Sequence, residues 1–139
     1  MDLWNRASKM GYVFGNNGGF TLPNTSVRSP DAALILRSRY DALDAADRKK
    51  FAHICPDFVI EIVLGTDQAS ILHRKMKEWM TNGCRLAWMI NPNRNETTVY
   101  RENGETKRKP FVQTLYGENV LPGFQVNVAE VFRADGLRG

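Results

Sequence analysis

The sequence predicts a single domain with a mixed α/β (α+β) fold, and three consecutive segments carry this prediction. Residues 57–64, "DFVIEIVL", form an apolar run that is typical of a central strand covered on both faces of a sheet. Residues 70–82, "SILHRKMKEWMTN", have the spacing of an amphipathic helix that Gly83 closes. Residues 85–90, "RLAWMI", form a second buried strand. Strand, helix and strand in this order favour a mixed sheet with flanking helices.

The other segments predict further strands and turns around this unit. We expect a hairpin of two short strands in residues 12–22, a strand at 31–36, a loop with one helical turn at 40–56, a hairpin at 97–112 that turns at Asn103-Gly104, and a closing strand at Phe124 to Val128. The first ten residues resemble the last turns of a helix, with Gly11 as its cap. No linker divides the chain, so residues 1–139 form one domain.

Composition indicates a soluble, cytoplasmic protein. Hydrophobic residues make up 42% of the chain and charged residues 24%, as in globular proteins. No apolar run approaches the roughly 18–20 residues of a membrane helix, and no secretory signal opens the chain. Cys55 and Cys84 have no CxxC partner and no histidine cluster. We therefore expect free, buried thiols in a reducing compartment rather than a disulfide or a zinc site.

The net charge of +4 is unevenly distributed along the chain. Residues 1–70 hold 8 basic and 8 acidic residues, whereas residues 71–139 hold 11 basic and 7 acidic residues. Part of the excess is the run "KRK" at Lys107–Lys109. A basic half suits a polyanionic partner, and a solvated hairpin loop is the alternative interpretation of this run.

Two carboxylates stand out among the predicted strands. Glu61 lies in the middle of an apolar strand and shares a face with Val59 and Val63. A buried carboxylate must be neutral, paired or bound to metal, so Glu61 either forms a salt bridge or has a functional role. Asp31 follows Pro30 and opens a strand. It is either a turn residue or, beside Glu61, half of an oxygen-ligand site for Mg²⁺.

Lys75 stands out in the predicted helix. At ~100° per residue, Lys75 falls within the apolar arc, between Ile71 and Trp79. Its ammonium group either reaches out of the arc to water or meets an anion. The preceding strand, which carries Glu61, is close enough in sequence to supply that anion.

The combination of "SPDAAL", "PDFVIEIV" and a lysine on the following helix in "KMKEWMTNGCRLAWMINP" resembles the Uma-two family of predicted restriction endonucleases. This family belongs to the PD-(D/E)XK nuclease superfamily, and the resemblance runs from about Gly11 to Phe132. It implies a restriction-endonuclease-like mixed sheet, with Asp31 and Glu61 as acidic metal ligands and Lys75 as the active-site lysine. The superfamily's usual lysine position, two residues after the acid, is Val63 here.

The resemblance also implies a reaction and partners. Asp31, Glu61 and the Ile62 backbone carbonyl would hold Mg²⁺ (or Mn²⁺) for hydrolysis of a phosphodiester bond, and Lys75 would stabilise the developing charge. The substrate would be nucleic acid, with DNA as the expected class, and the basic second half would contact its backbone. Relatives carry a further N-terminal helical segment, so we expect an N-terminally short domain that covers its exposed sheet face by forming a homodimer.

Another class of function is compatible with the same residues. The domain could be a catalytically degenerate nuclease fold that binds nucleic acid or a protein, with Asp31, Glu61 and Lys75 as a structural ion cluster. Metal binding separates the two classes, since only an active site should require it. The sequence contains neither a Gly-rich phosphate loop nor a Ser/His/Asp arrangement, which argues against a sugar- or nucleotide-binding enzyme.

Overall fold

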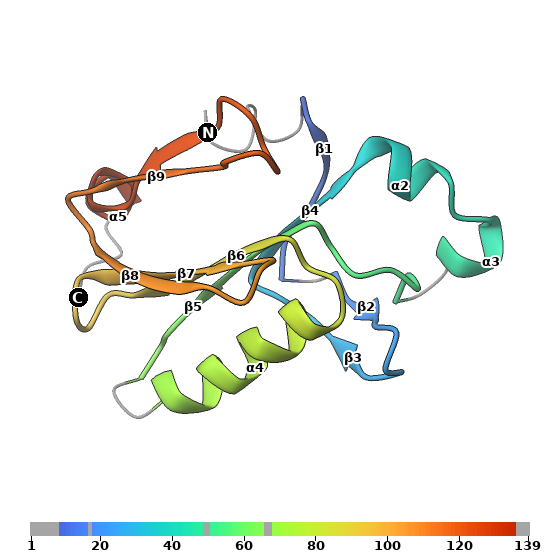
Figure 1. Ribbon diagram of the computed structural model, residues 1–139, viewed down its shortest axis with the longest axis horizontal. Coiled ribbons are helices and arrows are strands. Elements are labelled where there is room, and N and C mark those ends of the chain that lie inside the picture. Colours follow the sequence, from blue (N-terminus) through green and yellow to red (C-terminus); the bar gives the residue numbers. More distant parts are fainter. Residues whose placement is uncertain (1–8, 17, 49–50, 66–67, 136–139) are drawn as a thin grey trace.

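The computed structural model describes residues 9–16, 18–48, 51–65 and 68–135, and a six-stranded mixed sheet forms its centre (Figure 1). The strands follow the order β1-β4-β5-β6-β7-β8 across the sheet. Their bounds are β1 Gly11–Phe14, β4 Ala32–Leu36, β5 Phe58–Ile62, β6 Leu86–Asn91, β7 Glu96–Arg101 and β8 Thr106–Pro110. Only β5 and β6 are parallel neighbours within this sheet, and its other neighbours are antiparallel. The predicted mixed α+β class is confirmed.

The parallel pair is joined by α4 (Ala69–Thr81), as the strand–helix–strand pattern predicted. A parallel connection must cross over a face of the sheet, and α4 makes this crossing. Trp79 and Met76 are fully buried beneath the helix because they form the centre of its apolar stripe. Ile71, which the helical wheel placed in the apolar arc, is instead 56% exposed, so the buried stripe is narrower than predicted.

The two faces of the sheet carry separate hydrophobic cores, because side chains along a strand alternate between faces. On one face, Phe58 and Trp88 pack edge to face, and Phe124 stacks on Trp88. On the other face, Val59 and Val63 pack with α4 and with the first strands of the chain. Glu61 lies on this second face, as the alternation predicted, and it is only 3% exposed.

The predicted hairpin in residues 12–22 is wrong. β1 pairs antiparallel with β4, whereas β2 (Phe20–Thr21) pairs with β3 (Val27–Arg28) in a separate two-stranded ribbon. The pairing is decided by long-range packing, which the local Asn/Gly turn signal does not contain. Gly11 is not a helix cap but the first residue of β1, opposite Leu36. The N-terminal helix predicted before it, in residues 1–8, lies outside the described residues.

Three short helices and a second two-stranded ribbon complete the described part. Residues 40–56 were expected to form a loop with a helical turn, and they hold α3 (Ala45–Arg48) and the last two residues of α2 (Arg37–Asp41). The closing strand is β10 (Gln125–Asn127), which pairs with β9 (Thr114–Tyr116). It is followed by α5 (Val128–Asp135), which the sequence analysis did not predict. None of the described helices is long and apolar enough to cross a membrane.

Candidate active site

Asp31 and Glu61 lie next to each other where β4 begins and β5 ends. Ala32 pairs with Ile60, so continuing this antiparallel register places Asp31 opposite Glu61. Each residue contacts the backbone of the other strand. The Asp31 N–H donates to Glu61 Oε1 at 3.2 Å, and the Ile62 N–H donates to Asp31 Oδ2 at 2.7 Å. The two carboxylates, which are 30 residues apart in sequence, thus belong to one polar cluster.

Glu61 is a buried carboxylate held by three partners. Besides Asp31, it accepts a hydrogen bond from Trp79 Nε1 to Oε2 at 3.2 Å and pairs with Lys75. Burial raises the pKa of Glu61, while the charge of Lys75 and the indole N–H of Trp79 partly oppose this rise. A carboxylate with a raised pKa and a specific cationic partner is characteristic of functional sites and also of structural ion pairs.

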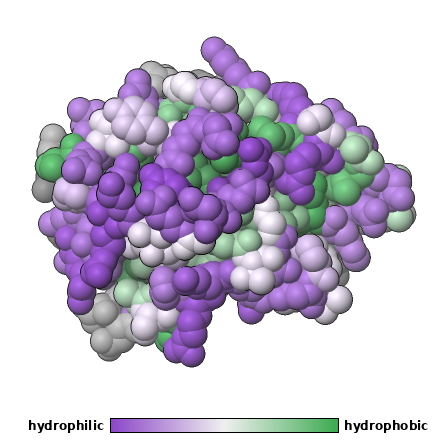
Figure 2. Space-filling model, viewed as in Figure 1, coloured by the Kyte–Doolittle hydropathy of each residue, from purple (hydrophilic) through white to green (hydrophobic). Residues whose placement is uncertain are grey.

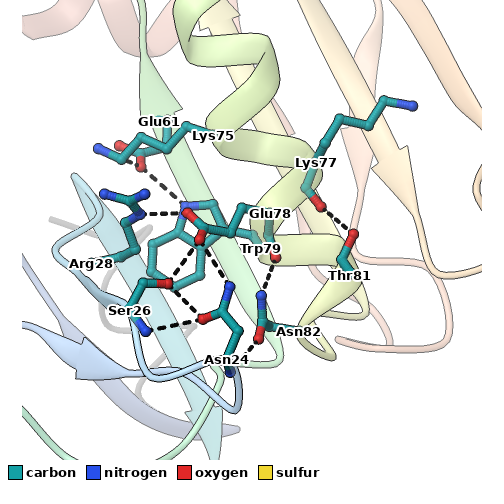
Figure 3. A network of polar contacts seen from close by, with 10 residues as sticks. All are labelled: Asn24, Ser26, Arg28, Glu61, Lys75, Lys77, Glu78, Trp79, Thr81 and Asn82. Carbon is teal, nitrogen blue, oxygen red and sulfur yellow. Dashed lines mark hydrogen bonds and ion pairs between the residues drawn. The ribbon is translucent and has the colours of Figure 1, made fainter.

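Lys75 meets the anion that the preceding strand supplies. Its Nζ lies 3.4 Å from Glu61 Oε2, and its side chain is 33% exposed. Figure 3 shows the Lys75 side chain lying alongside Glu61 at the edge of α4. Of the two interpretations of this lysine, the structure therefore shows the ion pair with an anion.

The atoms left free in this cluster suit a hard cation. Among the described residues, no hydrogen bond is made to Asp31 Oδ1, because only Oδ2 accepts from Ile62. The Ile62 N–H points toward β4, so its carbonyl faces the same neighbour. The register places Pro30 opposite, and proline has no N–H to donate to that carbonyl. Carboxylate and carbonyl oxygens are the ligand types that Mg²⁺ prefers.

The protein ligands for a cation are few. No group of three or more His, Cys, Asp and Glu side chains that could hold a metal occurs in the described ranges. A site built on Asp31, Glu61 and the Ile62 carbonyl would leave positions for water and substrate oxygens, which Mg²⁺ commonly retains. The residues present therefore fit a weakly held Mg²⁺ better than a caged structural metal.

A second ion pair, which the sequence analysis missed, lies beside the first. Arg28 Nε donates to Glu78 Oε1, and Glu78 Oε2 also accepts from Ser26 Oγ at 2.7 Å and Asn24 Nδ2 at 3.0 Å (Figure 3). The hydrogen bond from Arg28, followed by those from Ser26 and Asn24, lowers the pKa of Glu78 to about 2. This network attaches the β2–β3 ribbon to α4. Arg28 and Lys75 line the same hollow beside α4.

Asp57 is a further buried carboxylate that sequence reasoning missed. It is fully buried, its Oδ2 pairs with Arg39 at 2.9 Å, and the same oxygen accepts from the Leu36 N–H at 2.9 Å. The signal available in the sequence was Pro56-Asp57 directly before a strand, the same dipeptide that precedes β4 at Pro30-Asp31. Because its contacts join the far ends of β4 and β5, we assign Asp57 a structural role.

A cationic hollow of about 550 Å³ opens on the side of α4 that carries Lys75. The charged side chains that line it are Arg28, Arg74, Lys75, Lys77 and Glu78. Four of these are basic, and the one acid is already paired with Arg28. The hollow can therefore accept an anion next to the Asp31–Glu61 cluster.

Fold and site together describe a nuclease-like α+β protein with an acidic pair and a lysine at a sheet end. The family model described as "Uma2: Putative restriction endonuclease" matches residues 1–129, so the chain belongs to this family. A solved structure from Anabaena variabilis, titled "a putative nuclease belonging to DUF820", has the same fold, with a TM-score of 0.76. It is 18% identical, and the match covers 95% of this chain and 75% of that one. No curated protein matches the sequence significantly.

Proposed function

We propose that the protein is a metal-dependent endonuclease that hydrolyses phosphodiester bonds in nucleic acid, with DNA as the expected substrate. The observation that carries this proposal is the convergence of Asp31, Glu61 and Lys75 at one end of the β4–β5 pair, beside a cationic hollow. Membership of a family described as restriction endonucleases supports the same reaction class.

Each residue of the cluster has its own role in the proposed reaction. Asp31, Glu61 and the Ile62 carbonyl would hold Mg²⁺ or Mn²⁺, and the ion would lower the pKa of a water and neutralise phosphate charge. Lys75 stabilises the negative charge that develops on the phosphoryl oxygens, because its ammonium lies beside Glu61 and faces the hollow. Trp79 holds one Glu61 oxygen through its indole N–H, which keeps the carboxylate in a single orientation.

A degenerate, binding-only domain is the second candidate, and one observation favours it. Both oxygens of Glu61 are already paired by protein groups: Oε1 with Asp31, and Oε2 with Trp79 and Lys75. In this case the cluster is a structural ion network, and the basic surface binds nucleic acid or a protein without cleaving it.

Cleavage assays with matched variants separate the two candidates. Supercoiled plasmid or a single-stranded oligonucleotide is incubated with each protein at increasing concentrations of Mg²⁺ or Mn²⁺. The proteins are the wild type, the variants Asp31→Asn and Glu61→Gln, and the control Glu102→Gln. Glu102 is an acidic residue of the β7–β8 turn, its side chain is 68% exposed, and it lies outside the cluster. We expect cleavage to fall at least about 10²-fold in the first two variants and to stay unchanged in the control.

Metal binding gives the second readout. Mn²⁺ at about 100 times its dissociation constant should stabilise the wild type by about 2.7 kcal/mol, and this gain should be lost in Asp31→Asn. A melting temperature that is indifferent to Mn²⁺, together with no cleavage, would establish the binding-only candidate.

The proposal also covers the cellular location and the oligomeric state of the protein. We place the protein in the cytoplasm, which the two free buried thiols, Cys55 and Cys84, support because such thiols persist in reducing compartments. We also propose that it works as a homodimer, for which sedimentation at high concentration is the measurement. A strictly monomeric species there would rule the homodimer out.

A further inference from the structure

A second cationic hollow lies on the opposite flank of α4. It has a volume of about 660 Å³ and opens between α4, the end of β6 and the β7–β8 hairpin. In Figure 2 a paler band lies between the hydrophilic side chains over this hairpin and those over α4, where the hollow opens. Its lining includes His73 and the charged residues Arg74, Arg94, Glu96, Lys107 and Arg108. Basic groups thus outnumber the single acid. Of these basic groups, only Arg74 also lines the first hollow, beside the proposed cleavage site.

The run at Lys107–Lys109 is divided between the two faces of the sheet. Arg108 pairs with Thr98, which lines the hollow, so the Arg108 side chain lies on the α4 face. Lys109 pairs with Thr97 and therefore points to the opposite face. Arg108 is 69% exposed, and its nearest acid, Glu96, is 4.0 Å away, a distance at which an exposed pair contributes little. Arg108 is therefore available to a further anion.

The amino-terminal end of α4 adds a second source of positive potential. Ala69 and Ser70 line the hollow, and α4 begins there. Gln68 makes no side-chain hydrogen bond to the first turn, and that turn contains no acidic residue. The positive end of a thirteen-residue helix dipole is thus left without an anionic partner from its own turn.

His73 is held in one orientation by a buried partner. Its Nδ1 lies 2.6 Å from the hydroxyl of Tyr100, which is 1% exposed. The other neighbour of that hydroxyl is the thioether of Met89 at 3.8 Å, a weak acceptor. This contact occupies Nδ1 and leaves Nε2, on the ring edge away from Tyr100, for a further partner.

Arg74 connects this hollow with the one beside the candidate active site, since it lines both. His73 and Lys75 are two residues apart, about 200° around the helix, so they lie on its opposite flanks. A chain of phosphates that crosses the first half of α4 could contact both hollows, since a helix is about 10–12 Å across. One strand advances about 3.4 Å per nucleotide, so this span corresponds to roughly three or four nucleotides.

We propose that the hollow between α4 and the β7–β8 hairpin binds a backbone phosphate of the nucleic-acid strand, several nucleotides from the phosphate at Asp31 and Glu61. This inference rests on the proposed function for the identity of the ligand. The hollow serves affinity and positioning, while the bond is cleaved on the other flank of α4.

The test measures binding without cleavage. A fluorescently labelled duplex and a labelled single strand are titrated with protein in EDTA from 50 to 200 mM salt, and anisotropy reports the dissociation constant. The variants are Arg94→Ala with Arg108→Ala as a double variant, the charge reversal Arg108→Glu, and the control Lys109→Ala on the opposite face of the same strand. Circular dichroism verifies that each variant is folded.

We expect the double variant to bind about tenfold more weakly, with the slope of log K against log salt reduced by about 1, since the hollow binds one phosphate and each phosphate contact contributes about 0.9 to that slope in duplex DNA. Arg108→Glu should weaken binding further than an alanine there, and Lys109→Ala should bind as the wild type does. Three results would overturn the proposal. They are equal losses of affinity in Lys109→Ala and the double variant, unchanged binding in the double variant, and no binding by the wild type. A cleavage assay that fails for the wild type would refute the endonuclease without affecting this comparison.

Discussion

Replacing Lys75 by methionine tests how the buried Glu61 is stabilised. The substitution keeps the length and helix propensity of the side chain and removes its charge. It takes away the one cation that lies 3.4 Å from Glu61 Oε2, while the hydrogen bonds from Trp79 and Asp31 remain. The variant therefore isolates the contribution of the ion pair.

The magnitude follows from the distance and the exposure. Two unit charges 3.4 Å apart attract each other by about 5 kcal/mol at an effective dielectric constant of about 20. Water screens this pair because the Lys75 side chain is 33% exposed, and Lys75 itself recovers solvation when the pair is lost. Full loss of a partner to a buried charge costs about 3–5 kcal/mol, so we expect about 1–3 kcal/mol here. This corresponds to a drop of roughly 3–10 °C in melting temperature for a domain of this size.

The loss of stability in Lys75→Met should depend on pH in a defined direction. Burial raises the pKa of Glu61 in the folded state, so the folded state binds a proton more tightly than the unfolded chain does. The contribution of Glu61 to stability is then fully present below the unfolded pKa of about 4.3 and declines as the pH rises through the folded pKa. Removing Lys75 raises the folded pKa further, which enlarges the decline at high pH. The variant should lose stability at pH 8 and little or none at pH 4.

Thermal unfolding followed by circular dichroism in EDTA at pH 8 and pH 4 measures this difference. The matched control is Lys77→Met, the same substitution at an exposed position of the same helix. Acid destabilisation by other groups is common to both variants and cancels in the comparison. Equal shifts of Lys75→Met at the two pH values, or a shift at pH 8 no larger than that of Lys77→Met, would refute the ion pair as the stabilising interaction.

Two further predictions concern the Glu78 network and the thiols. The pKa of Glu78 is about 2 because Arg28 donates to it, so its contribution to stability is present above the unfolded pKa and is lost as the pH falls from about 4.5 toward 2. Glu78→Gln should lower the free energy of unfolding by about 1 kcal/mol in urea at pH 7 and by less at pH 3, and a constant difference would contradict this origin. Burial raises the pKa of Cys55 to about 12 and that of Cys84 well above its ordinary value, so neither thiol should react with a disulfide reagent at pH 8 until the protein is unfolded. Rapid labelling of the native protein would show that these sites open.

The strongest elements of the fold could be predicted from the sequence because their signals are local. The strand at Phe58–Ile62 and the helix at Ala69–Thr81 follow from the order of apolar residues, and the hairpin turn from Asn103-Gly104. The burial of Glu61 also follows, since alternation along a strand assigns each side chain to a face. The short helix after Asn127 escaped prediction because its apolar residues also fit the end of a strand.

The partners of each strand depend on contacts between distant segments, so only the tertiary structure decided them. The register of β4 against β5 places Asp31 beside Glu61, and no local pattern specifies that register. The alignment of α4 across the sheet makes Trp79 a hydrogen-bond donor to Glu61, although its sequence position indicates only an apolar contact.

The sequence alone thus determined which residues could carry the chemistry: two acids at unusual positions in strands and a lysine within the apolar arc of a helix. The tertiary structure decided that they meet, that Arg28 is held by Glu78 next to them, and that Arg108 and Lys109 point to opposite faces. The physical reason is that charge and periodicity are properties of a segment. Proximity is a property of the packed sheet, whose cores on both faces select one arrangement of the segments.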